Sequence, residues 1–167
     1  MKQETFVFNK LPKSVDELKA MPEAAISSPF MTAALSVAVL CAYSENASAC
    51  VEMLNFLKGP DPLSPRDIQF LKERELVSKP YKMLSYFEGT SPQNGYVPGM
   101  PYKIIVSDNA YSFPSPDSAK LFIKSSGADS ARPVSMRLKP STGQWFLTDY
   151  VSLVVDIRVP DAVNPWA

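Results

Sequence analysis

The sequence contains no histidine. This absence excludes the Ser-His-Asp and Cys-His arrangements that activate a nucleophile, the zinc-binding His-Glu-x-x-His helix and any histidine general base. The six glycines are scattered and form neither a Gly-x-Gly-x-x-Gly fingerprint nor a lysine-bearing phosphate loop. A catalyst built from this chain would therefore have to use carboxylates, lysine, tyrosine or a thiol.

Cysteine is also scarce, with only Cys41 and Cys50 present. If one helix held both, they would lie about 13 Å apart along its axis, far beyond disulfide distance. We therefore expect two buried, inert thiols, and a disulfide only if the chain turns between them. Two cysteines without histidine are too few soft ligands for structural zinc, so the sequence predicts no metal site and no cofactor.

The chain has no excess charge of either sign, because 17 basic residues balance 17 acidic ones. Nucleic acid is therefore not an expected partner, since backbone binding needs clustered cations. The longest apolar run, from Phe30 to Tyr43, is too short for the roughly 20 residues that cross a bilayer, so we expect no membrane partner. The first residues lack the apolar core of a secretory signal, which predicts a cytoplasmic protein.

Helix signals fill the first half of the chain. Ser14 and Glu17 have the spacing of a capping box, and Ser28-Pro29 opens the most apolar segment with a cap and a first-turn proline. Asn46 is placed to cap the next helix, and Gly59 is placed to end it in a left-handed conformation. These signals predict a helical part over about residues 14–88.

Sheet signals follow an irregular connector at residues 89–101, where three glycines and three prolines interrupt regular structure. From residue 102 to residue 158 the apolar period changes from 3.6 to two. The expected strands are Tyr102–Ser107, a short Tyr111–Phe113, Ala119–Ser125, Arg132–Lys139, Gln144–Asp149 and Tyr150–Arg158. Residues 159–167 read as an irregular tail, in which we expect Trp166 to dock on the protein.

Together these segments predict a single α+β domain over residues 1–167. Its N-terminal helices would pack on a C-terminal curved antiparallel sheet of three to five strands, because a sheet with one apolar face must bury that face against another layer.

The best candidate pocket or interaction surface lies near the C-terminus. If the last strand is continuous, Asp149 shares a face with Trp145, and a carboxylate on an apolar face needs a partner or a raised pKa. The alternative is a bend at Asp149, with its carboxylate capping a turn or facing water. Asp156 and Arg158 are expected to form an ion pair, and no residue is assigned as catalytic. The candidate residues are Asp149, Tyr150, Trp145, Arg132, Arg137 and Trp166.

The segments Gly143–Leu153 and Asp156–Pro160 resemble the C-terminal pattern of small uncharacterised bacterial proteins that form a domain of unknown function. Similar glycine-tryptophan hairpins close cystatin-like sheets of the nuclear transport factor 2 type. The resemblance implies a curved sheet of that kind and brings no catalytic residues with it.

Three hypotheses about function remain. The first is a non-catalytic interaction or assembly module that binds itself or another protein, which the missing catalytic residue types and the balanced charge favour. The alternative is a small-ligand-binding domain with an aromatic-lined pocket between sheet and helices. The second alternative is a histidine-independent enzyme that uses Asp149 and Tyr150.

Overall fold

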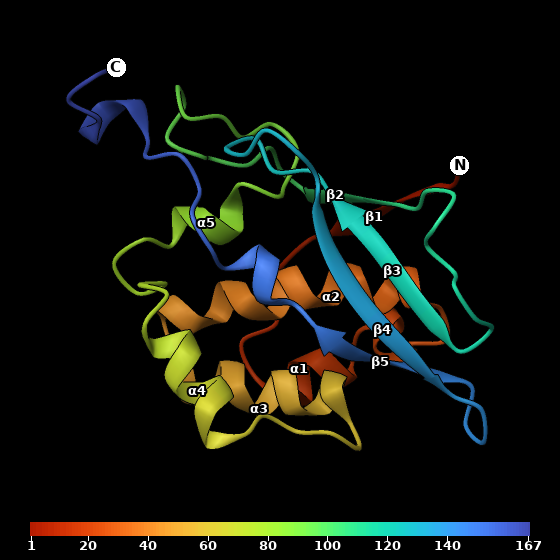
Figure 1. Cartoon of the computed structure of the whole chain (residues 1–167). Coiled ribbons are helices and arrows are strands. Elements are labelled where there is room, and N and C mark those ends of the chain that lie inside the picture. Colours follow the sequence, from red (N-terminus) through yellow and green to blue (C-terminus); the bar gives the residue numbers. More distant parts are fainter.

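A computed structural model describes all of residues 1–167 and has an α+β architecture (Figure 1). The five strands are β1 (Gln3–Phe8), β2 (Tyr102–Ser107), β3 (Ser118–Ile123), β4 (Arg132–Lys139) and β5 (Gln144–Asp149). The α-helices are α1 (Val15–Lys19), α2 (Pro29–Leu40), α3 (Ala47–Lys58), α4 (Pro65–Lys72) and α5 (Tyr81–Leu84). Short 3₁₀ helices are η1 (Pro22–Ala25), η2 (Cys41–Ser44), η3 (Val151–Leu153) and η4 (Asp161–Val163).

The strands form one curved antiparallel sheet in the order β1-β2-β3-β4-β5. The predicted α+β class and curved sheet are confirmed. The sheet also contains β1, from the N-terminus of the chain, which the sequence analysis did not predict. Its other four strands come from the second half of the chain, as expected. Between β2 and β3 only Val106 and Ser107 are paired, and the sheet opens beyond them. There the N–H of Glu88 donates to the carbonyl of Lys103 at 2.9 Å in place of a strand.

Helix α2 forms the centre of the protein and packs against all five strands. Every residue of α2 except Met31 is buried, as expected from a segment that is apolar on nearly all faces. Ser28 caps its first turn, accepting from the N–H of Phe30 at 3.1 Å. Helix α3 packs against α2, and α1 packs against α3 and η1 (Figure 1). One cluster of 35 buried apolar residues forms the core.

The expected helix boundaries hold in most places. Asn46 caps α3 by accepting from the N–H of Ala49, and Gly59 follows its last turn at φ +55°. Ser14 accepts from the N–H of Glu17, but the full reciprocal capping box lies at Ser64 and Asp67, at the start of α4.

Two predicted strands are wrong. Tyr111–Phe113 is a turn, because the side chain of Asn109 accepts from the N–H of Tyr111 at 2.8 Å and fixes a local bend. Tyr150–Arg158 is the short helix η3 followed by irregular chain. Its alternating apolar pattern arises because Leu153 and Ile157 turn into the core from a non-extended backbone.

The connector at residues 89–101 is irregular, as predicted, and hydrogen bonds tie it to the C-terminal segment. Tyr96 is fully buried, and its hydroxyl donates to the carbonyl of Arg158 at 2.7 Å. The N–H of Asp161 donates to the carbonyl of Pro92 at 3.0 Å. Connector and C-terminal tail are therefore bound to each other, whereas Trp166 is 92% exposed and docks on nothing in the chain.

Candidate functional site

Strand β1 lies at one edge of the sheet, and some of its backbone groups point away from β2. The N–H of Asp108 donates to the carbonyl of Lys2 at 3.0 Å, and the carbonyl of Lys103 points away from β1 to accept from Glu88. Since hydrogen-bonded pairs alternate along an antiparallel ladder, Glu4, Phe6 and Phe8 bond to β2. The N–H and C=O groups of the alternate residues point out of the sheet; these residues are Gln3, Thr5 and Val7.

These outward groups have no partner within the chain. No hydrogen bond outside the strand ladder involves the backbone of Gln3, Thr5 or Val7, and all three residues are exposed. Proteins often protect such edges with proline, lysine, a bulge or a covering segment. Between residues 3 and 8 there is no proline, no lysine and no bulge. The edge is therefore open to pairing with another strand.

The opposite edge of the sheet is protected. On β5 the N–H of Trp145 donates to the carbonyl of Ile26 at 2.8 Å, directly after η1. The hydroxyl of the buried Thr32 donates to the carbonyl of Trp145 at 2.6 Å. Helix α2 and the turn before it thus satisfy the outward groups of Trp145, which leaves β1 as the open edge.

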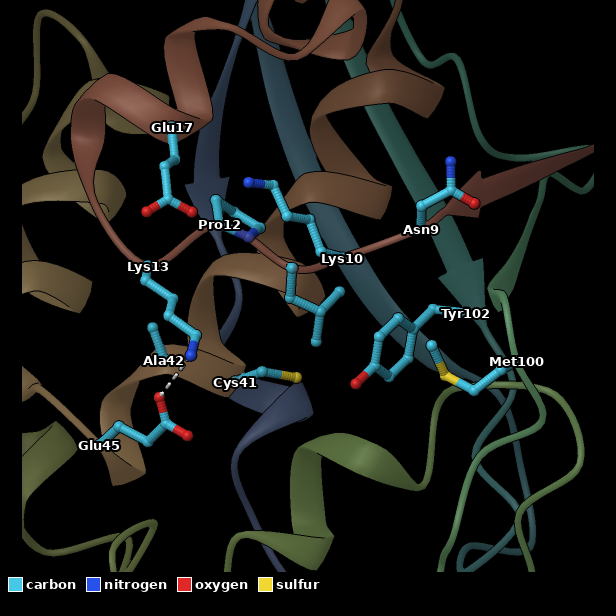
Figure 2. A pocket seen from close by; sticks show the side chains of 11 residues that line it. Asn9, Lys10, Pro12, Lys13, Glu17, Cys41, Ala42, Glu45, Met100 and Tyr102 are labelled. Atoms are coloured by element: carbon cyan, nitrogen blue, oxygen red, sulfur yellow. Dashed lines mark ion pairs between the residues drawn. The ribbon is translucent and has the colours of Figure 1, made fainter.

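A groove of about 560 Å³ lies beside the end of β1 (Figure 2). We call it the N-terminal groove; it is lined by Asn9–Lys13, Glu17, Cys41, Ala42, Glu45, Met100 and Tyr102. Its two lysines and two glutamates balance, and Lys13 pairs with Glu45 at 3.8 Å, an exposed contact of little energetic value. The groove offers a shaped surface without a concentrated charge.

The thiol in the N-terminal groove is not an activated nucleophile. Burial, and secondarily the neighbouring Cys50, raise the pKa of Cys41 far above its ordinary range. A reactive cysteine needs the opposite, a lowered pKa in an electropositive setting. Both cysteines are free thiols, as expected. The groove can therefore bind through shape and contact.

The structure separates Asp149 from Tyr150. The Asp149 side chain is exposed and accepts from the N–H of Val151 at 3.0 Å, which forms a local turn where β5 ends. Tyr150 is buried, and burial raises its pKa above the ordinary value, with Asp67, Cys50 and Asp149 adding to the shift. Neither residue lines the N-terminal groove or the groove that contains Arg137.

Arg132 binds the chain that follows β5. Its guanidinium donates to the carbonyls of Ser152 and Asp156, each at 2.7 Å. These bonds satisfy backbone groups that leave the sheet and explain why this segment needs no strand partner. The expected Asp156–Arg158 ion pair is absent, because Arg158 pairs with Asp129 instead.

Arg137 lies in a second groove, of about 400 Å³, at the β4–β5 end of the sheet. We call it the cationic groove; it is lined by Lys58, Pro60, Asp61, Arg137, Leu138, Lys139, Pro140, Phe146 and Thr148. Trp145 is half-buried against the core, and Trp166 is remote from the core in the exposed tail. The six candidate residues therefore do not form one site.

Sequence reasoning missed two features. The run Thr5-Phe6-Val7-Phe8 is rich in β-branched and aromatic residues and could have indicated a strand. Lys58, at the end of α3, is 7% exposed although its side chain is charged. No local signal marks that lysine, since its burial depends on the distant hairpin of β4 and β5.

The described chain contains no group of three or more His, Cys, Asp or Glu side chains that could hold a metal ion. None of its helices has the length and apolar character needed to span a bilayer.

The comparisons with known proteins identify a family. The family model described as "Domain of unknown function (DUF6935)" matches residues 10–161, which is most of the chain. The chain therefore belongs to this family, as its resemblance to an uncharacterised domain family implied. No curated protein and no solved structure matches it.

Proposed function

We propose that this protein is a non-catalytic assembly module that pairs with a second copy of itself along β1. The open edge of Gln3, Thr5 and Val7 carries the proposal, because three outward N–H and three outward C=O groups lie there without partners. Strand addition to an open edge supplies main-chain hydrogen bonds to such groups and is a recurrent mode of protein recognition.

A second copy is favoured because the edge is complementary to itself. In an antiparallel pair with its two-fold axis at Thr5, the outward groups of Thr5 meet those of the other copy's Thr5, and Gln3 meets Val7. Glu4 then lies opposite Phe6, so no like charges face each other. The two sheets would join into one continuous ten-stranded sheet, twice the five strands of one chain.

The test is the molar mass in solution, measured by size-exclusion chromatography with light scattering over a wide concentration range. We expect the native chain to form a dimer and Thr5→Lys to shift it to monomer, because two ammonium groups would lie directly opposite each other. Thr148→Lys is the matched control, since it places the same charge at an exposed threonine of the other edge strand.

Charge exchange tests the register itself. Thr5→Glu should also be monomeric alone, and mixing it with Thr5→Lys should restore a dimer, because opposite charges then meet across the axis. A native chain that stays monomeric at all concentrations would overturn the proposal. A dimer unaffected by either substitution at Thr5 would place the interface elsewhere.

A further inference from the structure

The cationic groove contains three basic side chains and one acidic side chain. Lys58 comes from the end of α3, and Arg137 and Lys139 come from β4, so two separate parts of the fold contribute cations to one groove. Asp61 is the only acidic residue in the lining. In a chain with equal numbers of acidic and basic residues, this clustering reflects the tertiary structure and not the composition.

None of the three cations has an ion-pair partner. The chain forms five ion pairs, and none involves Lys58, Arg137 or Lys139. Their side chains also make no hydrogen bond with any protein group. The side chain of Lys58 is largely buried, but its ammonium is not among the buried atoms without a partner, so the charged end reaches the surface of the groove. It is therefore free to contact an anion there.

The groove also has a fixed apolar wall. The ring of Phe146 lies so close to Gly59 that a Cβ there would come within 2.4 Å of it. Arg137 is the direct cross-strand partner of Phe146, so both side chains stand on the same face of the sheet. Leu138 and Pro140 extend the apolar lining. Charge and an aromatic surface therefore lie next to each other.

We infer that the cationic groove binds a small phosphate ester, with its phosphoryl group among Lys58, Arg137 and Lys139 and its apolar portion on Phe146. A phosphate monoester carries nearly two negative charges near neutral pH and accepts several hydrogen bonds, which matches three cations better than a single carboxylate does. Arginine adds the forked geometry that phosphate accepts. The volume of about 400 Å³ is in the range of small-ligand sites. This inference is independent of pairing at β1.

Phenyl phosphate is a suitable probe, because it combines a phosphoryl dianion with one aromatic ring. Binding would be measured by titration calorimetry and by amide chemical shifts at low salt, with inorganic phosphate, phenol and benzoate as comparison ligands. We expect saturable binding of phenyl phosphate that weakens with salt, weaker binding of inorganic phosphate, and little binding of phenol or benzoate. The shifts should centre on Gly59, Arg137 and Phe146.

Variants then assign the site. Arg137→Gln should weaken binding by about ten-fold or more, the usual loss for a charge-assisted hydrogen bond, and its exposed position leaves the fold intact. Lys120→Gln is the matched control: this exposed cation lies on β3 outside the groove and should leave binding unchanged. Absence of saturable phenyl phosphate binding would overturn the inference, and so would equal binding by native protein and Arg137→Gln.

Discussion

The hydroxyl of Thr32, inside the central helix α2, donates to the carbonyl oxygen of Trp145 on the edge strand β5 at 2.6 Å. The two residues are 113 positions apart in the sequence. This bond joins the two layers of the fold and also occupies an acceptor that an intruding strand would need. It therefore has consequences for both stability and association.

Replacing Thr32 with valine should lower the free energy of unfolding by about 1–2 kcal/mol, because the half-buried carbonyl of Trp145 loses its donor while the side-chain volume is kept. Urea denaturation measures the change. Thr148→Val, at an exposed threonine of β5, should change the stability by less than about 0.5 kcal/mol. Equal effects at both positions would contradict the role given to the hydroxyl.

Replacing Gly59 with alanine should be strongly destabilising. Gly59 has φ +55°, and an added Cβ would also meet the Phe146 ring at 2.4 Å. Gly143 has φ +72° and open space around it, so Gly143→Ala reports the backbone cost alone, about 1–2 kcal/mol. We expect Gly59→Ala to cost about 1–3 kcal/mol more than this control in urea denaturation, the usual range for overpacking. Similar losses of unfolding free energy in both variants would show that the Phe146 ring moves aside at little cost.

Arg132→Lys should destabilise the protein although it conserves charge. One ammonium group cannot reproduce the planar fork that reaches the carbonyls of both Ser152 and Asp156. We expect a loss of about 1–2 kcal/mol and faster amide exchange in residues 151–158. Arg137→Lys is the control, since the Arg137 side chain bonds to no protein group, and its stability should match that of the native chain. If Arg132→Lys is as stable as the native chain, the two hydrogen bonds of Arg132 do not hold residues 151–158 in place.

The protein should lose stability above pH 9. Burial raises the pKa of the Cys50 thiol from 9.0 to about 12, so the folded state holds a proton that the unfolded chain releases. The contribution is fully present below pH 9 and is lost as the pH rises towards 12, with about 1.4 kcal/mol gone at pH 10 for this one thiol. Urea denaturation at pH 8 and pH 10 measures the loss.

Cys50→Ala separates the thiol from other alkaline effects. The variant will be less stable at every pH because a buried side chain is shortened, but its loss between pH 8 and pH 10 should be smaller than that of the native chain. Cys41, whose pKa is also raised by burial, should supply part of the remaining loss. An unchanged pH dependence in the variant would argue against a buried neutral thiol at position 50.

The sequence predicted the helical layer well and the sheet in part. Local signals such as Ser28-Pro29 and Asn46 predicted helix starts correctly, because a cap satisfies backbone donors only a few residues away. Alternation predicted β4 and β5 correctly, yet the same alternation failed after Tyr150. An apolar residue at every second position can face the core from a strand or from an irregular segment clamped by a distant side chain such as Arg132.

The candidate site was less predictable than the fold. Asp149 and Tyr150 attracted attention as neighbours in sequence, but one faces water and the other is buried. The cationic groove could not be predicted from the sequence, because Lys58 and Arg137 come from distant segments that lie together only in the folded chain. Trp166 was expected to dock on the protein and is exposed.

The sequence by itself determined the absence of imidazole, the neutral net charge, the apolar character of the central helix and the places where most helices begin. These properties depend on residue types and on contacts within a few positions. The tertiary structure decided which sheet edge stays open, where Arg132 donates and which cations share a groove. Such properties depend on groups twenty or more positions apart, and no local pattern encodes distances between them.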